Sequence, residues 1–203
     1  KGYYNGKNLF IETALAKNNS GHIITSGNIP FDLNIGSSTF GEYFENDSIN
    51  LKTEADLSDL PFLSPYITDL DSAEGSYKFF LNLKGPFKNL ARDGYILIQD
   101  GILYTQLLND PIRFINGEAQ LINNKLKIKN LSADLNIENG KNYGKEIANT
   151  QIHGEINLNK FFNPHYNLRL NSKNASFKLL FLDIYGETNL DLSIFGRDTV
   201  YIA

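Results

Sequence analysis

Apolar and polar residues alternate with a period of two along most of this chain, a pattern typical of strands with one covered and one wet face. The longest run is NNKLKIKNLSADLNIE, residues 123–138. At Asn130 the alternation slips by one residue and then resumes. The run is either two strands about a bend at Asn130 or one long strand with a β-bulge there, and a bulge would restore the apolar phase.

The same alternation recurs in residues 49–58, 77–84, 152–158, 166–171 and 189–194. Gly, Asn and Asp gather between these runs, as turns require. Three dipeptides are typical of tight hairpins: Asn123-Asn124, Asn139-Gly140 and Asp100-Gly101. The pattern predicts some ten or eleven antiparallel strands with short connections.

Two short segments suggest helix. Residues 59–67 could form a capped turn, with Asp59 as N-cap and Pro61 in the first turn. Residues 174–180, NASFKLL, are a second and weaker helical candidate.

The run from Gly75 to Leu135 resembles the TamB and AsmA-like proteins of Gram-negative envelopes. The resemblance is carried by a strand ending in Leu83-Lys84-Gly85 before Pro86, a strand entering Asp100-Gly101, and Pro111-Ile112 ahead of Gly117-Glu118-Ala119. Similar strands follow at residues 153–158 and 189–196, so the likeness covers roughly residues 49–196.

This resemblance implies an all-β fold: a long antiparallel sheet curled into a β-taco or half-pipe with an apolar interior, here with one or two short helices. It implies a periplasmic lipid-binding module that shields phospholipid acyl chains during transport between the inner and outer membranes. A role in outer-membrane protein assembly, with a barrel partner of the TamA or BamA type, is also implied. The full-length protein would be anchored in the inner membrane. The family offers no catalytic residue and no cofactor to carry over.

Apolar positions of the alternating runs are the expected groove lining, and Tyr77 and Tyr166 add hydroxyls to that side. Phe80, Ile96 and Ile98 place apolar groups on the otherwise polar face, either packed under a local segment or forming a docking surface. The expected lining is Leu51, Leu57, Phe79, Leu81, Leu83, Leu97, Ile112, Phe114, Leu121, Leu126, Ile128, Leu131, Leu135, Ile152, Ile156, Leu158, Leu168, Leu170, Leu190, Leu192 and Ile194.

Composition narrows the function classes. The 203 residues carry a net charge of −4 and no basic stripe, which argues against a nucleic-acid partner. Cysteine is absent, and no sequence motif of a hydrolase, zinc site or phosphate-binding loop occurs, so we expect no enzyme and no metal. His153 falls on a polar strand face, where a solvated side chain is expected. Both ends look cut within strands, so residues 1–203 are expected to be a single module excerpted from a longer chain.

Two other functions remain open from the sequence. The same fold could act as a scaffold or chaperone that adds nascent outer-membrane barrel strands to its edges by β-augmentation. A plain β-sandwich binding module would explain the one-sided alternation by covering the apolar face with a second sheet.

Overall fold

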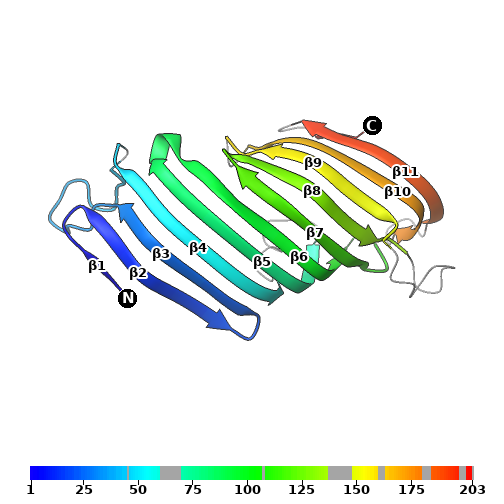
Figure 1. Cartoon of the computed structure of the whole chain (residues 1–203), viewed down its shortest axis with the longest axis horizontal. Helices are drawn as coiled ribbons and strands as arrows, with labels where there is room; N and C mark the ends of the chain where they lie inside the picture. The colour runs from blue at the N-terminus through cyan, green and yellow to red at the C-terminus, as the bar shows by residue number, and fades with distance from the viewer. Residues whose placement is uncertain are drawn as a thin grey trace.

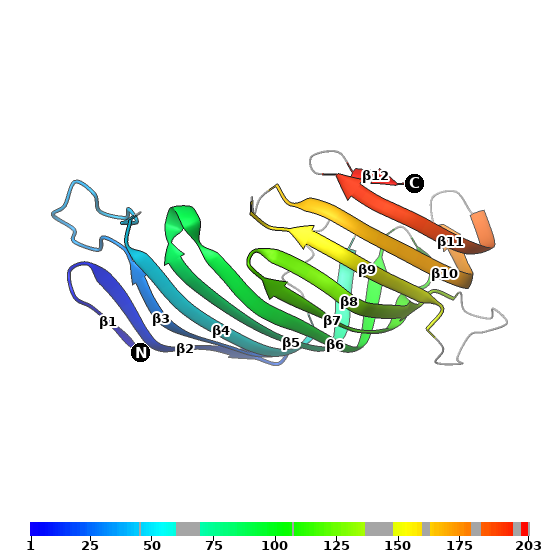
Figure 2. The same cartoon turned by 45° about the horizontal axis from the view of Figure 1, so that its top comes forward.

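The computed structural model describes residues 1–44, 46–59, 70–106, 108–136, 148–159, 163–179, 184–196 and 200–202. They form one antiparallel sheet of twelve strands, each hydrogen-bonded to its neighbours in sequence order (Figures 1 and 2). The strands are β1 (Gly2–Tyr4), β2 (Asn8–Asn18), β3 (Gly21–Pro30), β4 (Ser48–Asp59), β5 (Leu70–Pro86), β6 (Ala91–Thr105), β7 (Ile112–Ile122), β8 (Lys125–Asp134), β9 (Thr150–Asn157), β10 (His165–Leu179), β11 (Ile184–Gly196) and β12 (Val200–Ile202).

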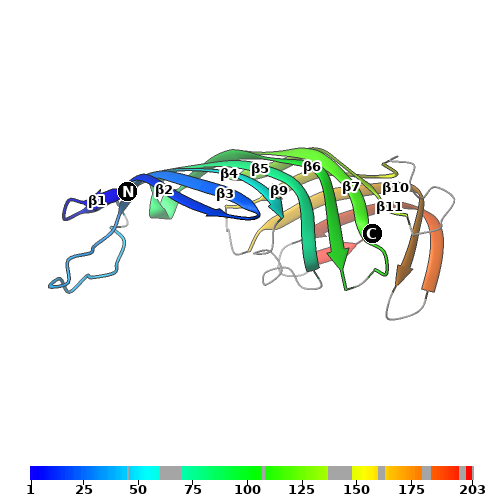
Figure 3. The same cartoon turned by 90° about the horizontal axis from the view of Figure 1, so that it is seen from below.

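The sheet curls but does not close. Strands β1 and β12 lie at its two ends, and Figure 3 shows the strands arching over a concave side. The expected all-β half-pipe is confirmed. A 3₁₀ turn, η1 (Phe87–Asn89), is the one helical element among the described residues. Because those residues form a single sheet, the β-sandwich alternative is wrong for the described part of the chain.

Bulges bend the strands of the middle and C-terminal sheet. Pairing registers shift in β5, β6, β7, β8 and β10. Asp100, Phe114 and Asn174 have left-handed φ angles of 50°, 49° and 53° at or next to such shifts. A bulge adds twist and bends its strand, and Figure 3 shows the ends of β5, β6, β10 and β11 turning down from the sheet. This bend forms one side wall of the half-pipe.

The slip at Asn130 is a β-bulge. Ile128 pairs with Gly154 and Leu131 pairs with Ile152, so Lys129 and Asn130 together oppose the single residue between those partners. The bulge lies inside one strand, β8, which rules out the two-strand reading of this stretch. Its effect is the expected one, because Ile128 and Leu131 remain on the same face.

Turn predictions from dipeptides succeed once and fail once. Asn123 and Asn124 form the two-residue turn between β7 and β8, with φ angles of 49° and 63°. Asp100-Gly101 is not a hairpin turn but the bulge inside β6, because the strand continues to Thr105. Asn139-Gly140 lies outside the described residues.

The helix expected at residues 174–180 is wrong. β10 runs through it to Leu179, with Ala175 and Ser176 buried at 0% and 3% exposure. Asn174 adopts the left-handed φ of a bulge instead of a helical one, so the break in alternation came from the bulge. Of the other helical candidate, Asp59 ends β4, and residues 60–67 lie outside the described part.

A cluster of buried apolar side chains lies on the concave side of β4 and β5. Ala55, Leu57, Ala73 and Tyr77 are buried there, at 3–7% exposure. The half-buried side chains packed against them are Ile23, Phe79, Ile98 and Leu103.

Candidate functional site

The candidate site is the concave face of the sheet, termed the trough below. Directly paired residues of neighbouring antiparallel strands project from the same face, so the registers trace rungs across the sheet. One rung, the middle rung, runs without interruption from β2 to β11. Its members are Ala16, Ile23, Ala55, Phe79, Ile96, Ala119, Ile128, Gly154, Leu168 and Ile194.

The rung contains no polar side chain and spans ten strands, or roughly 43 Å at about 4.8 Å per strand. Neighbouring rungs are similar: Leu57, Tyr77 and Ile98 pair in succession, as do Leu121, Leu126 and Ile156. The trough is therefore a continuous apolar strip across the sheet.

Registers place most of the expected lining on this face. These residues are Leu51, Leu57, Phe79, Leu81, Leu83, Ile112, Leu121, Leu126, Ile128, Leu131, Ile152, Ile156, Leu168, Leu170, Leu190, Leu192 and Ile194. Phe114 sits in a bulge without a direct partner, while Leu135 and Leu158 follow the ends of β8 and β9, so no register fixes their face.

Leu97 is a correction. It pairs with Lys78 and Glu118 and so lies on the outer face. Ile96 and Ile98, expected on the polar face, pair with Phe79 and Tyr77 and belong to the trough.

The stretch Tyr95–Ile98 is apolar on both faces, so alternation alone could not choose between them. Phe80 does lie outside, where its ring stacks on Tyr95 at 5.9 Å between centroids. Ile23 and Ala119 also belong to the trough. The only sequence signal for Ala119 was its distance from the Asn123-Asn124 turn, which fixes its partner as Ile128.

The trough floor stays partly open to solvent. Ile96 is 38% exposed, and most of the rung residues are only half-buried. A hollow of about 170 Å³ lies over β6, β7 and β8, with Ile98, Ala119, Ile128 and Leu131 among its walls. Gly117 at its base has no side chain to fill the space.

Three hydroxyls of the trough, those of Tyr77, Thr25 and Thr53, are bonded within the protein. Tyr77 Oη donates to the Glu74 carbonyl at 2.8 Å, and burial, followed by the Glu74 charge, raises the pKa of Tyr77. The hydroxyls of Thr25 and Thr53 bond to each other at 3.1 Å. Because these groups already have partners, they add little polarity to the strip.

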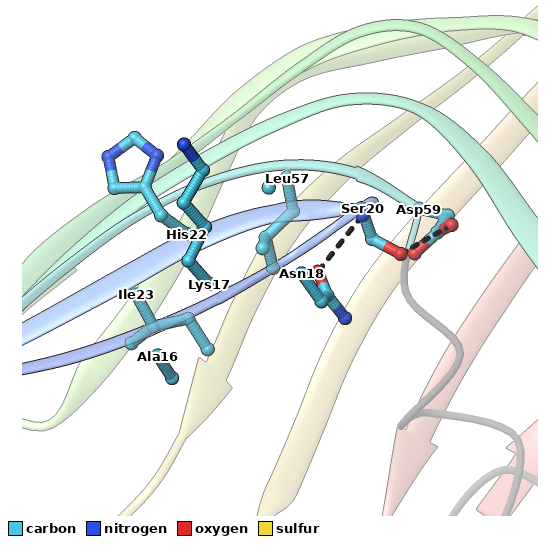
Figure 4. A pocket seen from close by; sticks show the side chains of 9 residues that line it. Ala16, Lys17, Asn18, Ser20, His22, Ile23, Leu57 and Asp59 are labelled. Atoms are coloured by element: carbon cyan, nitrogen blue, oxygen red, sulfur yellow. Dashed lines mark hydrogen bonds between the residues drawn. The ribbon is translucent and has the colours of Figure 1, made fainter.

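A second hollow, of about 150 Å³, opens at the β2–β3 turn. Figure 4 shows Ala16 and Ile23 under the arch of the strands and Lys17 and His22 above it. The Ser20 hydroxyl donates to Asp59 Oδ2 at 2.8 Å, so this end of the trough is polar.

The outer, convex face of the sheet is charged and exposed to solvent. Ion pairs join neighbouring strands there: Lys78 with Asp56 at 3.5 Å, Lys125 with Glu155 at 3.7 Å, Lys129 with Glu118 at 3.7 Å, and Arg169 with Asp191 at 2.7 Å. His153 is exposed on this face, where it pairs across the strands with Arg169. The two faces of the sheet thus differ sharply in polarity.

Within the described ranges, no cluster of three or more His, Asp or Glu side chains could hold a metal ion. The same residues contain no helix long and apolar enough to cross a membrane.

Known proteins provide no template for the trough: no family model, curated protein or solved structure matches this chain.

Proposed function

We propose that this chain is a lipid-binding module that shields phospholipid acyl chains in its trough, as in a TamB- or AsmA-like bridge between the inner and outer membranes. The observation that carries the proposal is the middle rung. It places an apolar residue on each strand from β2 to β11, a side chain on every strand except β9, where Gly154 stands, and no charged residue among them.

The energetics of such binding are favourable. Moving a methylene group from water into an apolar site gains about 0.8 kcal/mol, so a chain of about sixteen carbons gains on the order of 10 kcal/mol before losses. The gain is non-directional, because it depends on buried area and not on bond geometry. A lipid could therefore slide along the rung, as a conduit requires.

The proposal places the module in the periplasm, within a longer protein anchored in the inner membrane. The resemblance described above supports this placement. The partner at the outer membrane would be a barrel protein.

The absence of cysteine allows a direct test. Single cysteines are introduced at adjacent β8 positions, Ile128→Cys in the trough and Lys127→Cys on the outer face, and each is coupled to a benzophenone. Irradiation with radiolabelled phosphatidylethanolamine should label the protein through residue 128 several-fold more than through residue 127. Equal labelling at both positions would exclude an acyl-chain site in the trough.

A second function is favoured by the sheet ends. Among the described residues, β12 pairs only with Ile194–Gly196 of β11, and β1 together with Lys1 reaches only residues 9–13 of β2. The remaining edges offer unpaired backbone groups to an added strand, as a scaffold for barrel strands would need. Cross-linking of an unfolded barrel segment to Asp191→Cys but not to Asp56→Cys, in the sheet interior, would support this function.

A further inference from the structure

The loop between β3 and β4 presents apolar side chains that nothing in the described structure covers. Ile35 is 89% exposed and Phe40 is 53% exposed. Ile35 is the most exposed large apolar side chain of the described residues. From Leu33 to Gly41 the sequence LNIGSSTFG contains no charged residue.

The loop is folded and its polar groups are largely satisfied from within. Asp32 organises it: the carboxylate accepts hydrogen bonds from Asn34 N–H at 2.8 Å and from the Thr39 hydroxyl at 2.6 Å. The Ser37 and Thr39 hydroxyls and Asn34 N–H lower the pKa of Asp32, so it stays ionised. Further N–H groups donate inside the loop, those of Gly36, Ser37, Thr39, Phe40 and Gly41.

Aromatic rings gather at the base of the loop. Tyr43 stacks on Phe87 of η1 with ring centroids 5.1 Å apart, and it packs against Phe31 at 5.0 Å. Tyr43 and Phe87 are about half exposed, at 49% and 50%. The Lys7–Asp47 ion pair, at 3.0 Å, ties the end of the loop to the turn before β2. The tip of the loop, residues 33–41, is uncharged, and the exposed Glu42 follows it just before Tyr43.

We propose that this loop docks onto a lipid surface, with Ile35 and Phe40 inserted below the headgroups. Three features fit a bilayer. Uncharged segments avoid the cost of desolvating ions, and internally bonded N–H groups avoid leaving donors unpaired in hydrocarbon. Half-exposed aromatic rings suit the headgroup level, where tyrosine is enriched in membrane proteins.

The site lies apart from the trough and does not rest on the lipid-binding function proposed above. In Figure 3 the loop hangs from the N-terminal part of the sheet, on the same side as the bent strand ends. Docking there would hold the concave side of the sheet toward the lipid surface. Because the tip is uncharged, zwitterionic lipid should suffice and salt should have little effect on binding.

The chain contains no tryptophan, so the fluorescence of a single introduced tryptophan reports on the surroundings of that one position. The probe is Phe40→Trp, mixed with phosphatidylcholine vesicles. The matched control is Leu15→Trp on β2, a position that is 61% exposed but lies outside the loop. We expect a blue shift and quenching by brominated phosphatidylcholine at residue 40 but not at residue 15. Emission at residue 40 that is unchanged by vesicles would overturn the proposal.

A second measurement uses vesicle co-sedimentation of the otherwise unaltered chain. Ile35→Ser with Phe40→Ser should lower partitioning by about tenfold or more, since each lost side chain removes apolar area from the inserted tip. Circular dichroism checks the fold of the variant. Undiminished sedimentation would mean that vesicles bind elsewhere, for example through the trough, and would also overturn the loop proposal. Trough occupancy is read separately, by cross-linking through residue 128.

Discussion

The side-chain amide of Asn149 pairs with both main-chain polar atoms of Leu135: Nδ2 donates to the Leu135 carbonyl at 3.1 Å, and Oδ1 accepts from Leu135 N–H at 3.0 Å. Asn149 directly precedes β9. The pairing between β8 and β9 ends at this point, with Ala133 opposite Thr150. Its own N–H donates to the Ala133 carbonyl, and its carbonyl accepts from Lys173 N–H. One residue thus joins β8 to β10 beyond the start of β9.

Removing this amide should weaken the wall. Asn149→Ala leaves the Leu135 N–H without its partner, whereas the Leu135 carbonyl keeps the bond from Ser176 N–H at 3.0 Å. An unsatisfied donor of this kind costs about 1–3 kcal/mol of unfolding free energy. Urea denaturation measures it. Asn167→Ala, at an exposed position of β10, is the control and should change stability by less than about 0.5 kcal/mol. An equal loss in both variants would contradict the bridging role.

Gly154 should not tolerate a side chain. It lies in the middle rung at φ +135°, and an added Cβ would stand 2.2 Å from the Asn167 carbonyl oxygen. Gly154→Ala should therefore destabilise the fold by about 2–3 kcal/mol. Gly36→Ala is the matched control, because its φ is unstrained and the nearest atom would be 3.7 Å away. Thermal unfolding of the two variants makes the comparison, and similar melting temperatures would refute it.

Asp134 should make stability depend on acid pH. Burial raises the pKa of its carboxyl above 3.8, against smaller lowering effects of Asn136 and Arg113. The folded state therefore binds the proton more readily than the unfolded state does. The resulting stabilisation is fully present below pH 3.8 and is lost as pH rises through the folded-state pKa.

Asp134→Asn removes this dependence while keeping an acceptor for the Asn136 amide, which donates to Asp134 Oδ1. The variant should be more stable than the wild type at pH 7, and the difference should shrink toward pH 3. Urea unfolding at both pH values tests this. A constant difference would show that folding does not shift the pKa of this carboxyl, and a difference that grows on acidification would show that folding stabilises the carboxylate; either result would contradict the prediction.

The Arg169–Asp191 pair on the outer face should matter little. The guanidinium donates to both carboxylate oxygens, at 2.9 and 2.7 Å, yet both side chains are more than half exposed. Solvent screens such pairs, so Arg169→Ala should destabilise less than Asn149→Ala. Its effect on the unfolding midpoint should fade in 1 M salt as a general consequence of screening. A salt-independent loss would point to packing by the arginine stem.

Much of the trough could be predicted because one-sided alternation assigns a face without knowledge of pairing. In β4, β9 and β11 polar residues occupy every second position, so Leu51, Ile152 and Leu192 could face only one way. The same argument fails at Tyr95–Ile98, where both faces are apolar. There the register with β5 decides, by pairing Leu97 with Lys78 on the outer face.

Bulges are the second feature, after strands that are apolar on both faces, that limits prediction of the fold from sequence. The slip at Asn130 was readable because alternation resumed cleanly after it. At Asn174 the bulge is followed by the buried pair Ala175 and Ser176, so both faces look alike and the segment resembled a helix. Asp100-Gly101 has the composition of a hairpin turn, but a left-handed φ at Asp100 serves a bulge equally well.

The sequence by itself determined an all-β chain whose sheet has one apolar and one charged face. Successive side chains of a strand point to opposite faces, so this property follows from local geometry alone. Only the tertiary structure decided that twelve strands form one curled sheet, that Ile96 faces inward, and that Ile35 and Phe40 are exposed. These features depend on which strand lies beside which, and at what offset. Pairing between neighbouring strands and the bulges within them set that offset, and only at the Asn123-Asn124 turn did a local pattern fix it.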